Sequence, residues 1–207
     1  MDAATALVRA YLQVNGYLTA TDYPLVETAQ YGLPKTITDI DMLAVRLARK
    51  GPRRRQSAAT TRVAGPMVVK VDPVLGAPAE HTDMIIAEIK QGRAQVNAAS
   101  RNPRVLAAAL ARFGCCAAGD APGLVQELLQ RGTAQAAGGH VIRMVLFASR
   151  GERAPRGWHW VRLDHVFRFL DEYLRSDRGV LETVDLHDPA LGWLSQLHKC
   201  GLTICSA

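Results

Sequence analysis

The sequence predicts an α/β fold in which a central mixed β-sheet is sandwiched between flanking helices. Segments with apolar residues at helical spacing alternate along the chain with short segments rich in β-forming residues. Two of the β-type segments, 17–26 and 36–47, follow each other across a turn that contains Gly32 and Pro34, as in a hairpin. A third, 84–90, is apolar enough to lie at the centre of a sheet.

The elements of the first half have local signatures. Leu7, Tyr11 and Val14 recur every four and three positions, and Gly16 follows as a helix stop. The expected elements of this half are, in order, a helix at 2–15 and strands at 17–26, 36–47, 67–71 and 84–90.

Helix boundaries in the second half are marked by capping residues. Gly92 begins a helical stretch, and Asn102 with Pro103 provides the cap and first-turn proline of a new helix that stops at Gly114. The remaining expected elements are, in order, a helix from Asp120 to Gly132, strands at 141–148 and 157–162, a helix capped by Asp164, and a last helix from Asp188 to near Gly201.

Length and composition indicate one domain spanning residues 1–207, with additional strands and helices in its C-terminal half. No apolar run approaches the roughly 18 residues of a membrane span, and the first 16 residues lack the pattern of a signal peptide. The four cysteines are not spaced as a disulfide framework. We therefore expect a cytoplasmic protein with no membrane partner.

The basic residues are concentrated in an insertion at about 46–82. The net charge is +6, and arginines outnumber lysines, which favours phosphate recognition because the guanidinium is a planar fork. Six basic residues lie close together and are predicted to bind nucleic acid: Arg46, Arg49, Lys50, Arg53, Arg54 and Arg55. A solvated loop without a partner is the alternative.

Two predicted strands carry charged residues on one face. Side chains alternate along a strand, so Asp39 and Asp41 share a face of the second hairpin strand. By the same period, Glu88 and Lys90 share a face at the end of the apolar strand 84–90. Charges on a mostly buried sheet require ion pairing or a cation.

A divalent cation satisfies that requirement. Mg²⁺ takes oxygen ligands and is usually held by one or two carboxylates together with a substrate phosphate. Asp41 and Glu88 could supply the carboxylates for Mg²⁺ or Mn²⁺, which would activate water, and Lys90 could assist attack on a phosphodiester. A salt-bridged cluster on a sheet edge is the structural alternative.

In its order of elements the chain resembles the PD-(D/E)xK, or restriction-endonuclease-like, nuclease superfamily. The similar segments are GYLTATDYPLVE, TDIDMLAV and MIIAEIKQG, within residues 5–100. The resemblance implies a restriction-endonuclease-like three-layer sandwich. It also implies that Asp41 is the first acid, Glu88 the second and Lys90 the lysine of the motif, with the backbone carbonyl of Ile89 as a further metal ligand.

The resemblance also suggests accessory residues. Gln95, on the helix expected after the signature strand, is one candidate. Many relatives carry a glutamate on the first helix, where this chain offers only Asp2 near the helix start, and Glu27 or Asp39 could take that role instead.

The expected function is therefore that of a Mg²⁺- or Mn²⁺-dependent endonuclease that hydrolyses phosphodiester bonds in DNA, with RNA as a second candidate substrate. Relatives of this kind commonly pair to cut two strands, which implies a homodimer. The alternatives are a catalytically inactive nucleic-acid-binding module and an interaction subunit of a DNA repair or defence complex.

Overall fold

The structure of the protein is a computed structural model that describes residues 2–28, 34–48, 69–176 and 188–202. The elements, in chain order, are α1 (Ala3–Val14), β1 (Leu18–Thr28), β2 (Pro34–Arg46), η1 (Pro73–Leu75), β3 (Asp83–Arg93), η2 (Ala99–Arg101), α2 (Pro103–Phe113), α3 (Ala121–Arg131), β4 (Thr133–Gln135), β5 (Val141–Arg150), β6 (His159–Arg162), α4 (Leu163–Ser176) and α6 (Pro189–Lys199). No helix in these ranges is long and apolar enough to cross a membrane.

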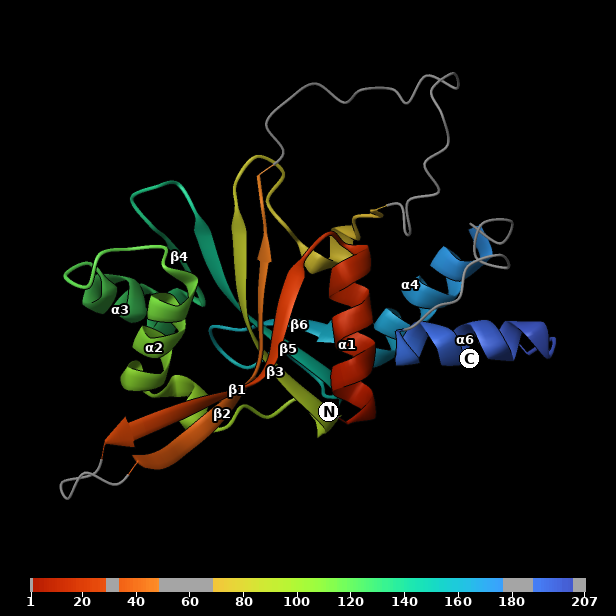
Figure 1. The fold of residues 1–207 in the computed structure, drawn as a ribbon, viewed down its shortest axis with the longest axis horizontal. Coiled ribbons are helices and arrows are strands. Elements are labelled where there is room, and N and C mark those ends of the chain that lie inside the picture. Colours follow the sequence, from red (N-terminus) through yellow and green to blue (C-terminus); the bar gives the residue numbers. More distant parts are fainter. Residues whose placement is uncertain (1, 29–33, 49–68, 177–187, 203–207) are drawn as a thin grey trace.

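The described strands form one mixed sheet of six, with helices on both faces (Figure 1). Its order is β1-β2-β3-β5-β4, and β6 also pairs with β5. β1 with β2, β2 with β3, and β4 with β5 are antiparallel, whereas β5 is parallel to both β3 and β6. The predicted α/β class and mixed sheet are therefore confirmed, and β3 is the central strand that its apolar sequence indicated.

Two hydrophobic cores lie on opposite faces of the sheet. Along β3, Ile85 and Ala87 pack with α1, α4 and α6, whereas Met84 and Ile86 pack with α2 and α3. Figure 1 shows these two helical groups on opposite sides of the strands. Because consecutive strand residues point to opposite faces, a strand between two cores must be apolar on both, as β3 is from Met84 to Ala87.

Most predicted helix boundaries are confirmed because they depend on local capping. Asn102 accepts a hydrogen bond from the backbone N–H of Arg104, and Asp188 accepts from those of Ala190 and Leu191. Gly114 and Gly132 adopt the left-handed conformation after α2 and α3. Residues 69–71, part of the predicted strand 67–71, are not in a strand; residues 67 and 68 lie outside the described ranges.

Three further predictions were wrong or incomplete. Gly92 does not begin a helix, because β3 continues to Arg93, which pairs with Arg150 of β5. Asp164 is not a cap, since α4 begins one residue earlier, and its carboxylate instead accepts from Arg162 and Arg168. The short strand β4 was not predicted. In each case tertiary pairing or a neighbouring side chain outweighed the local signal.

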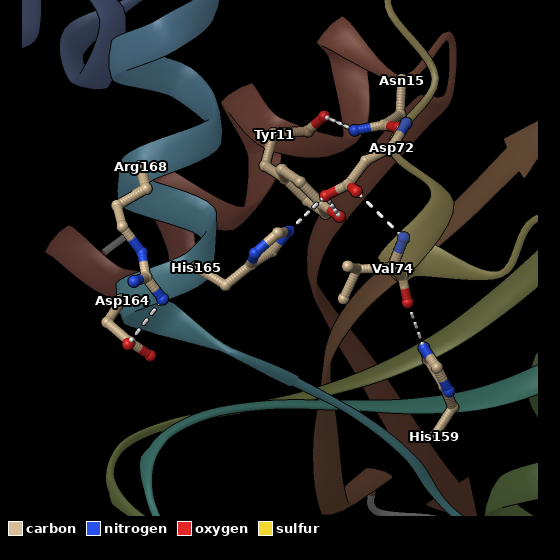
Figure 2. A network of polar contacts seen from close by, with 8 residues as sticks. All are labelled: Tyr11, Asn15, Asp72, Val74, His159, Asp164, His165 and Arg168. Carbon is tan, nitrogen blue, oxygen red and sulfur yellow. Dashed lines mark hydrogen bonds and ion pairs between the residues drawn. The ribbon is translucent and has the colours of Figure 1, made fainter. Parts of the chain in front are cut away.

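A buried polar network joins the segment around Asp72 to α1 and α4 (Figure 2). The Asp72 carboxylate accepts hydrogen bonds from the Tyr11 hydroxyl at 2.7 Å and the Val74 N–H at 2.9 Å, and His165 Nε2 lies 2.6 Å from it. The Asp72 N–H donates to Asn15 Oδ1 at 2.7 Å. The contacts with Tyr11, Asn15 and His165 therefore hold this segment against the helices, and the Val74 N–H bond orders the segment itself.

Candidate active site

The candidate site forms where β2 separates from β3. The ladder between the two strands runs from Arg46 paired with Asp83 to Met42 paired with Ala87, so the next position places Asp41 opposite Glu88. There the Asp41 carboxylate takes the place of a backbone acceptor, because its Oδ2 accepts a hydrogen bond from the Ile89 N–H at 2.7 Å. The register of the sheet thus brings together two acids 47 positions apart.

Glu88 is the first charged side chain on the inner part of β3. It is only 4% exposed, and its Oε2 accepts a hydrogen bond from the Ser100 hydroxyl. Its Oε1 lies 2.6 Å from Lys90 Nζ, yet this oxygen is buried and has no partner with hydrogen-bond geometry among the described residues. A cavity of about 10 Å³, lined in part by Trp158, adjoins the carboxylate. Glu88 therefore has unused acceptor capacity.

The electrostatics of the pair disfavour two negative charges. Burial raises the pKa of Asp41, the Ile89 N–H lowers it in part, and the negative charge of Glu88 raises it again. Lys90 acts in the opposite direction but is a single cation facing two acids. A second positive charge at this position would stabilise the ionised form of Asp41.

The donor set fits a hard divalent cation. In a strand, the N–H and C=O of one residue point to the same side, so the Ile89 carbonyl points to the side on which its N–H meets Asp41. Two carboxylates and one carbonyl are oxygen ligands of the kind that Mg²⁺ takes, with water and substrate phosphate completing its shell. Across the described residues, no three His, Cys, Asp or Glu side chains are grouped closely enough to hold a metal by themselves.

The start of α1 lies beside this site. The Thr5 N–H and, more weakly, the Gln91 side chain lower the pKa of Asp2, which is the N-cap of α1. The negative charge of Asp2 in turn contributes to the raised pKa of Asp41. Asp2 is therefore the acid that the first helix directs toward the site, and it is also occupied in capping that helix.

Of the six predicted basic residues, the structure describes only Arg46, and that residue is not at the carboxylates. Arg46 is only 9% exposed, donates to the Pro78 carbonyl and lies 5.4 Å from the centre of the Tyr17 ring, contacts that hold its side chain within the fold. Its role in binding nucleic acid stays a prediction. Arg46 also lies five residues along β2 from Asp41, about 16 Å away. The remaining members of the basic cluster are outside the described residues: Arg49, Lys50, Arg53, Arg54 and Arg55.

The accessory candidates have different outcomes. Gln95 is exposed and follows β3 in a non-helical segment, so the helix expected to carry it is absent from this stretch. Glu27 and Asp39 lie in β1 and β2, and their side chains are outside the described part of the structure.

Sequence reasoning missed Ser100 as a partner of Glu88. Ser100 belongs to the short helix η2, which folds back over the end of β3 before Asn102 caps α2. In the sequence, the one signal near Ser100 is the helix cap at Asn102, which shows that the chain turns between β3 and α2.

Comparisons of the chain with protein-family models, curated proteins and solved structures gave no match.

Proposed function

We propose that the protein is a Mg²⁺- or Mn²⁺-dependent nuclease of the PD-(D/E)xK type that hydrolyses phosphodiester bonds in DNA. The observation that carries the proposal is the meeting of Asp41, Glu88 and Lys90 at the point where β2 leaves β3, where two carboxylates face one cation among the described side chains. Partly buried acids of perturbed pKa with a specific charge partner are typical of functional sites.

The residues of the site have separable roles in this proposal. A bound cation would supply Lewis-acid polarisation of the phosphodiester and activation of water. Asp41, Glu88 and the Ile89 carbonyl would hold it, and Ser100 fixes the orientation of the Glu88 carboxylate. Lys90 can stabilise the negative charge that develops on the phosphate or orient the attacking water, because its ammonium has donors beyond its contact with Glu88.

A purely structural salt bridge explains the cluster less well. A structural pair normally has its charges matched and its hydrogen bonds satisfied. Here a buried Glu88 oxygen lacks a hydrogen bond within the described residues, and the pKa of Asp41 is raised by burial and by its acidic neighbour. A binding module that has lost turnover would keep the same residues, and activity measurements separate it from an enzyme.

The test is cleavage of single-stranded, double-stranded and branched DNA with Mg²⁺ or Mn²⁺. Wild type should cut at least one substrate, and Glu88→Ala and Lys90→Ala should each reduce the rate by at least about 100-fold. The matched controls are Glu127→Gln on α3 and Lys199→Ala on α6, which are exposed residues of the same types and should leave the rate unchanged.

Other outcomes redirect the assignment. A wild-type protein that binds DNA but cuts no substrate with either metal would support the binding module. A protein that neither binds nor cuts would leave the interaction subunit as the remaining candidate. Equal cutting by wild type and both site variants would show that the activity arises elsewhere.

A further inference from the structure

A depression of about 900 Å³ opens next to the candidate site, at the carboxyl ends of β3 and β5. Three arginines line it, Arg101, Arg153 and Arg156, together with Gln95 and small or apolar residues such as Pro155. Its volume is in the range of ligand-binding pockets.

The topology of the sheet explains why these arginines meet. β3 and β5 are parallel, and the last pair of their ladder is Arg93 with Arg150. The Ala94 N–H donates to the Arg150 carbonyl at 2.6 Å just beyond that pair. The chain after β3 and the loop after β5 therefore leave the sheet at the same edge, the position at which open α/β sheets commonly bind ligands.

Residues that line the pocket are close along the chain to residues of the candidate site. Arg101 follows Ser100, the residue whose hydroxyl bonds Glu88. The first residue of the pocket lining, Ala94, is four strand positions beyond Lys90, about 13 Å along the chain. Duplex DNA covers that distance in about four base-pair steps.

The charge of the pocket is not neutralised within the described chain. Arg101, Arg153 and Arg156 are exposed, and no described carboxylate lies within ion-pair distance of them. In contrast, Arg143 forms a two-pronged bond with the buried Asp83. Three uncompensated guanidinium groups around one depression favour an anionic ligand with several charges.

We propose that this pocket binds the phosphodiester backbone that flanks the phosphate attacked at Asp41 and Glu88. The identity of the ligand rests on the proposed nuclease function. The grouping of the three arginines around one pocket is a property of the structure and does not depend on that function. The planar guanidinium suits phosphate oxygens, and the three arginines would hold one strand at a fixed distance from the acids. This surface lies at the end of β3 opposite to the buried Arg46.

The experiment measures binding of a fluorescent DNA duplex and of a single strand by anisotropy, in EDTA and over a series of KCl concentrations. Arg153→Ala/Arg156→Ala should weaken duplex binding by at least about tenfold and reduce the slope of log affinity against log salt by about 1.8. Arg153→Lys/Arg156→Lys should retain most of the slope. The control Arg112→Ala/Arg168→Ala removes the same charge from exposed positions on α2 and α4 and should behave as wild type.

Binding tests the pocket and cleavage tests the nuclease, so either proposal can be contradicted without the other. An unchanged slope in the pocket variant overturns the pocket assignment, even where wild type cuts DNA. A reduced slope in a protein that cuts nothing supports the pocket and overturns the nuclease. A wild-type protein that binds neither duplex nor single strand overturns both. Thermal unfolding of each variant, expected to match wild type, shows that the effects are not those of misfolding.

Discussion

Asp72 is buried and Asp41 is partly buried, and their surroundings shift their pKa values in opposite directions. Burial acts to raise the pKa of Asp72, but hydrogen bonds from Tyr11, His165 and the Val74 N–H outweigh it, so the value is lowered. Burial also raises the pKa of Asp41, which receives one backbone hydrogen bond and faces Glu88.

The difference separates a structural acid from a candidate functional one. Around Asp72 the fold supplies the donors that an ionised carboxylate needs, and the network in Figure 2 is complete without a ligand. Around Asp41 and Glu88 the fold supplies too few, and the missing positive charge is what a cation would bring. The hydrogen bonds at Asp72 favour its ionised form and so add stability at neutral pH, whereas the raised pKa of Asp41 shows that its ionised form is disfavoured in the fold.

The largest expected effect separates activity from stability at Asp41. Asp41→Asn keeps an oxygen that can accept from the Ile89 N–H but removes a charge that burial and Glu88 disfavour. We expect metal-dependent cleavage to fall by at least about 100-fold while the free energy of unfolding stays equal or rises. Cleavage assays and urea unfolding at neutral pH measure the two quantities. An Asp41→Asn variant that is destabilised but cleaves normally would show that Asp41, like Asp72, is a structural acid.

The next effect is on stability at Asp72. Asp72→Ala would leave the buried Tyr11 hydroxyl and His165 without their acceptor, so we expect a loss of about 2–4 kcal/mol in the free energy of unfolding. Cleavage by the folded protein should be retained. Asp164→Ala is the control, because that acid is exposed and pairs with the exposed Arg162 and Arg168, so its loss should change stability by less than about 0.5 kcal/mol. A loss of cleavage in folded Asp72→Ala protein would assign the network to the site.

The smallest effects are in the pH dependence of stability. The lowered pKa of Asp72 contributes stability above the ordinary carboxyl pKa, and this contribution disappears as the pH falls through the lowered value. The raised pKa of Asp41 gives the opposite pH dependence. Its contribution to stability is present below the ordinary carboxyl pKa and is lost as the pH rises through the raised pKa.

These signs give a measurable contrast between two variants. Relative to wild type, Asp72→Asn should be destabilised at neutral pH, and the difference should shrink as the solution is acidified below about pH 4. Asp41→Asn should match wild type in acid and become the more stable protein as the pH rises toward 7. Denaturant unfolding from about pH 3 to 7 tests both curves, and two differences that run in parallel would contradict the opposite shifts.

Much of the framework followed from signals that act over a few residues. The caps at Asn102 and Asp188, the apolar run of β3 and the alternation that puts Glu88 and Lys90 on one face depend only on neighbouring positions. For that reason the α/β class and most element boundaries could be predicted, and the two charged residues of β3 could be named as site candidates.

The remaining features depend on partners that are distant in the sequence. Arg46 is of a residue type that is usually exposed, but here its guanidinium contacts the Tyr17 ring and the Pro78 carbonyl. The helix expected at Gly92 gives way to a longer strand because β5 offers a ladder up to Arg150. Local propensity is weak compared with such pairing, so these outcomes could not be obtained from the sequence alone.

The sequence by itself determined which residue types could carry chemistry, two acids and a lysine on strands that a core would otherwise make apolar, because side-chain alternation is a local property of the chain. Tertiary structure alone decided that Asp41 stands opposite Glu88, that Ser100 bonds the same carboxylate, and that arginines from two separate loops line one pocket. These contacts between distant residues depend on strand register and on parallel pairing, and both depend on how the whole sheet packs between its two cores.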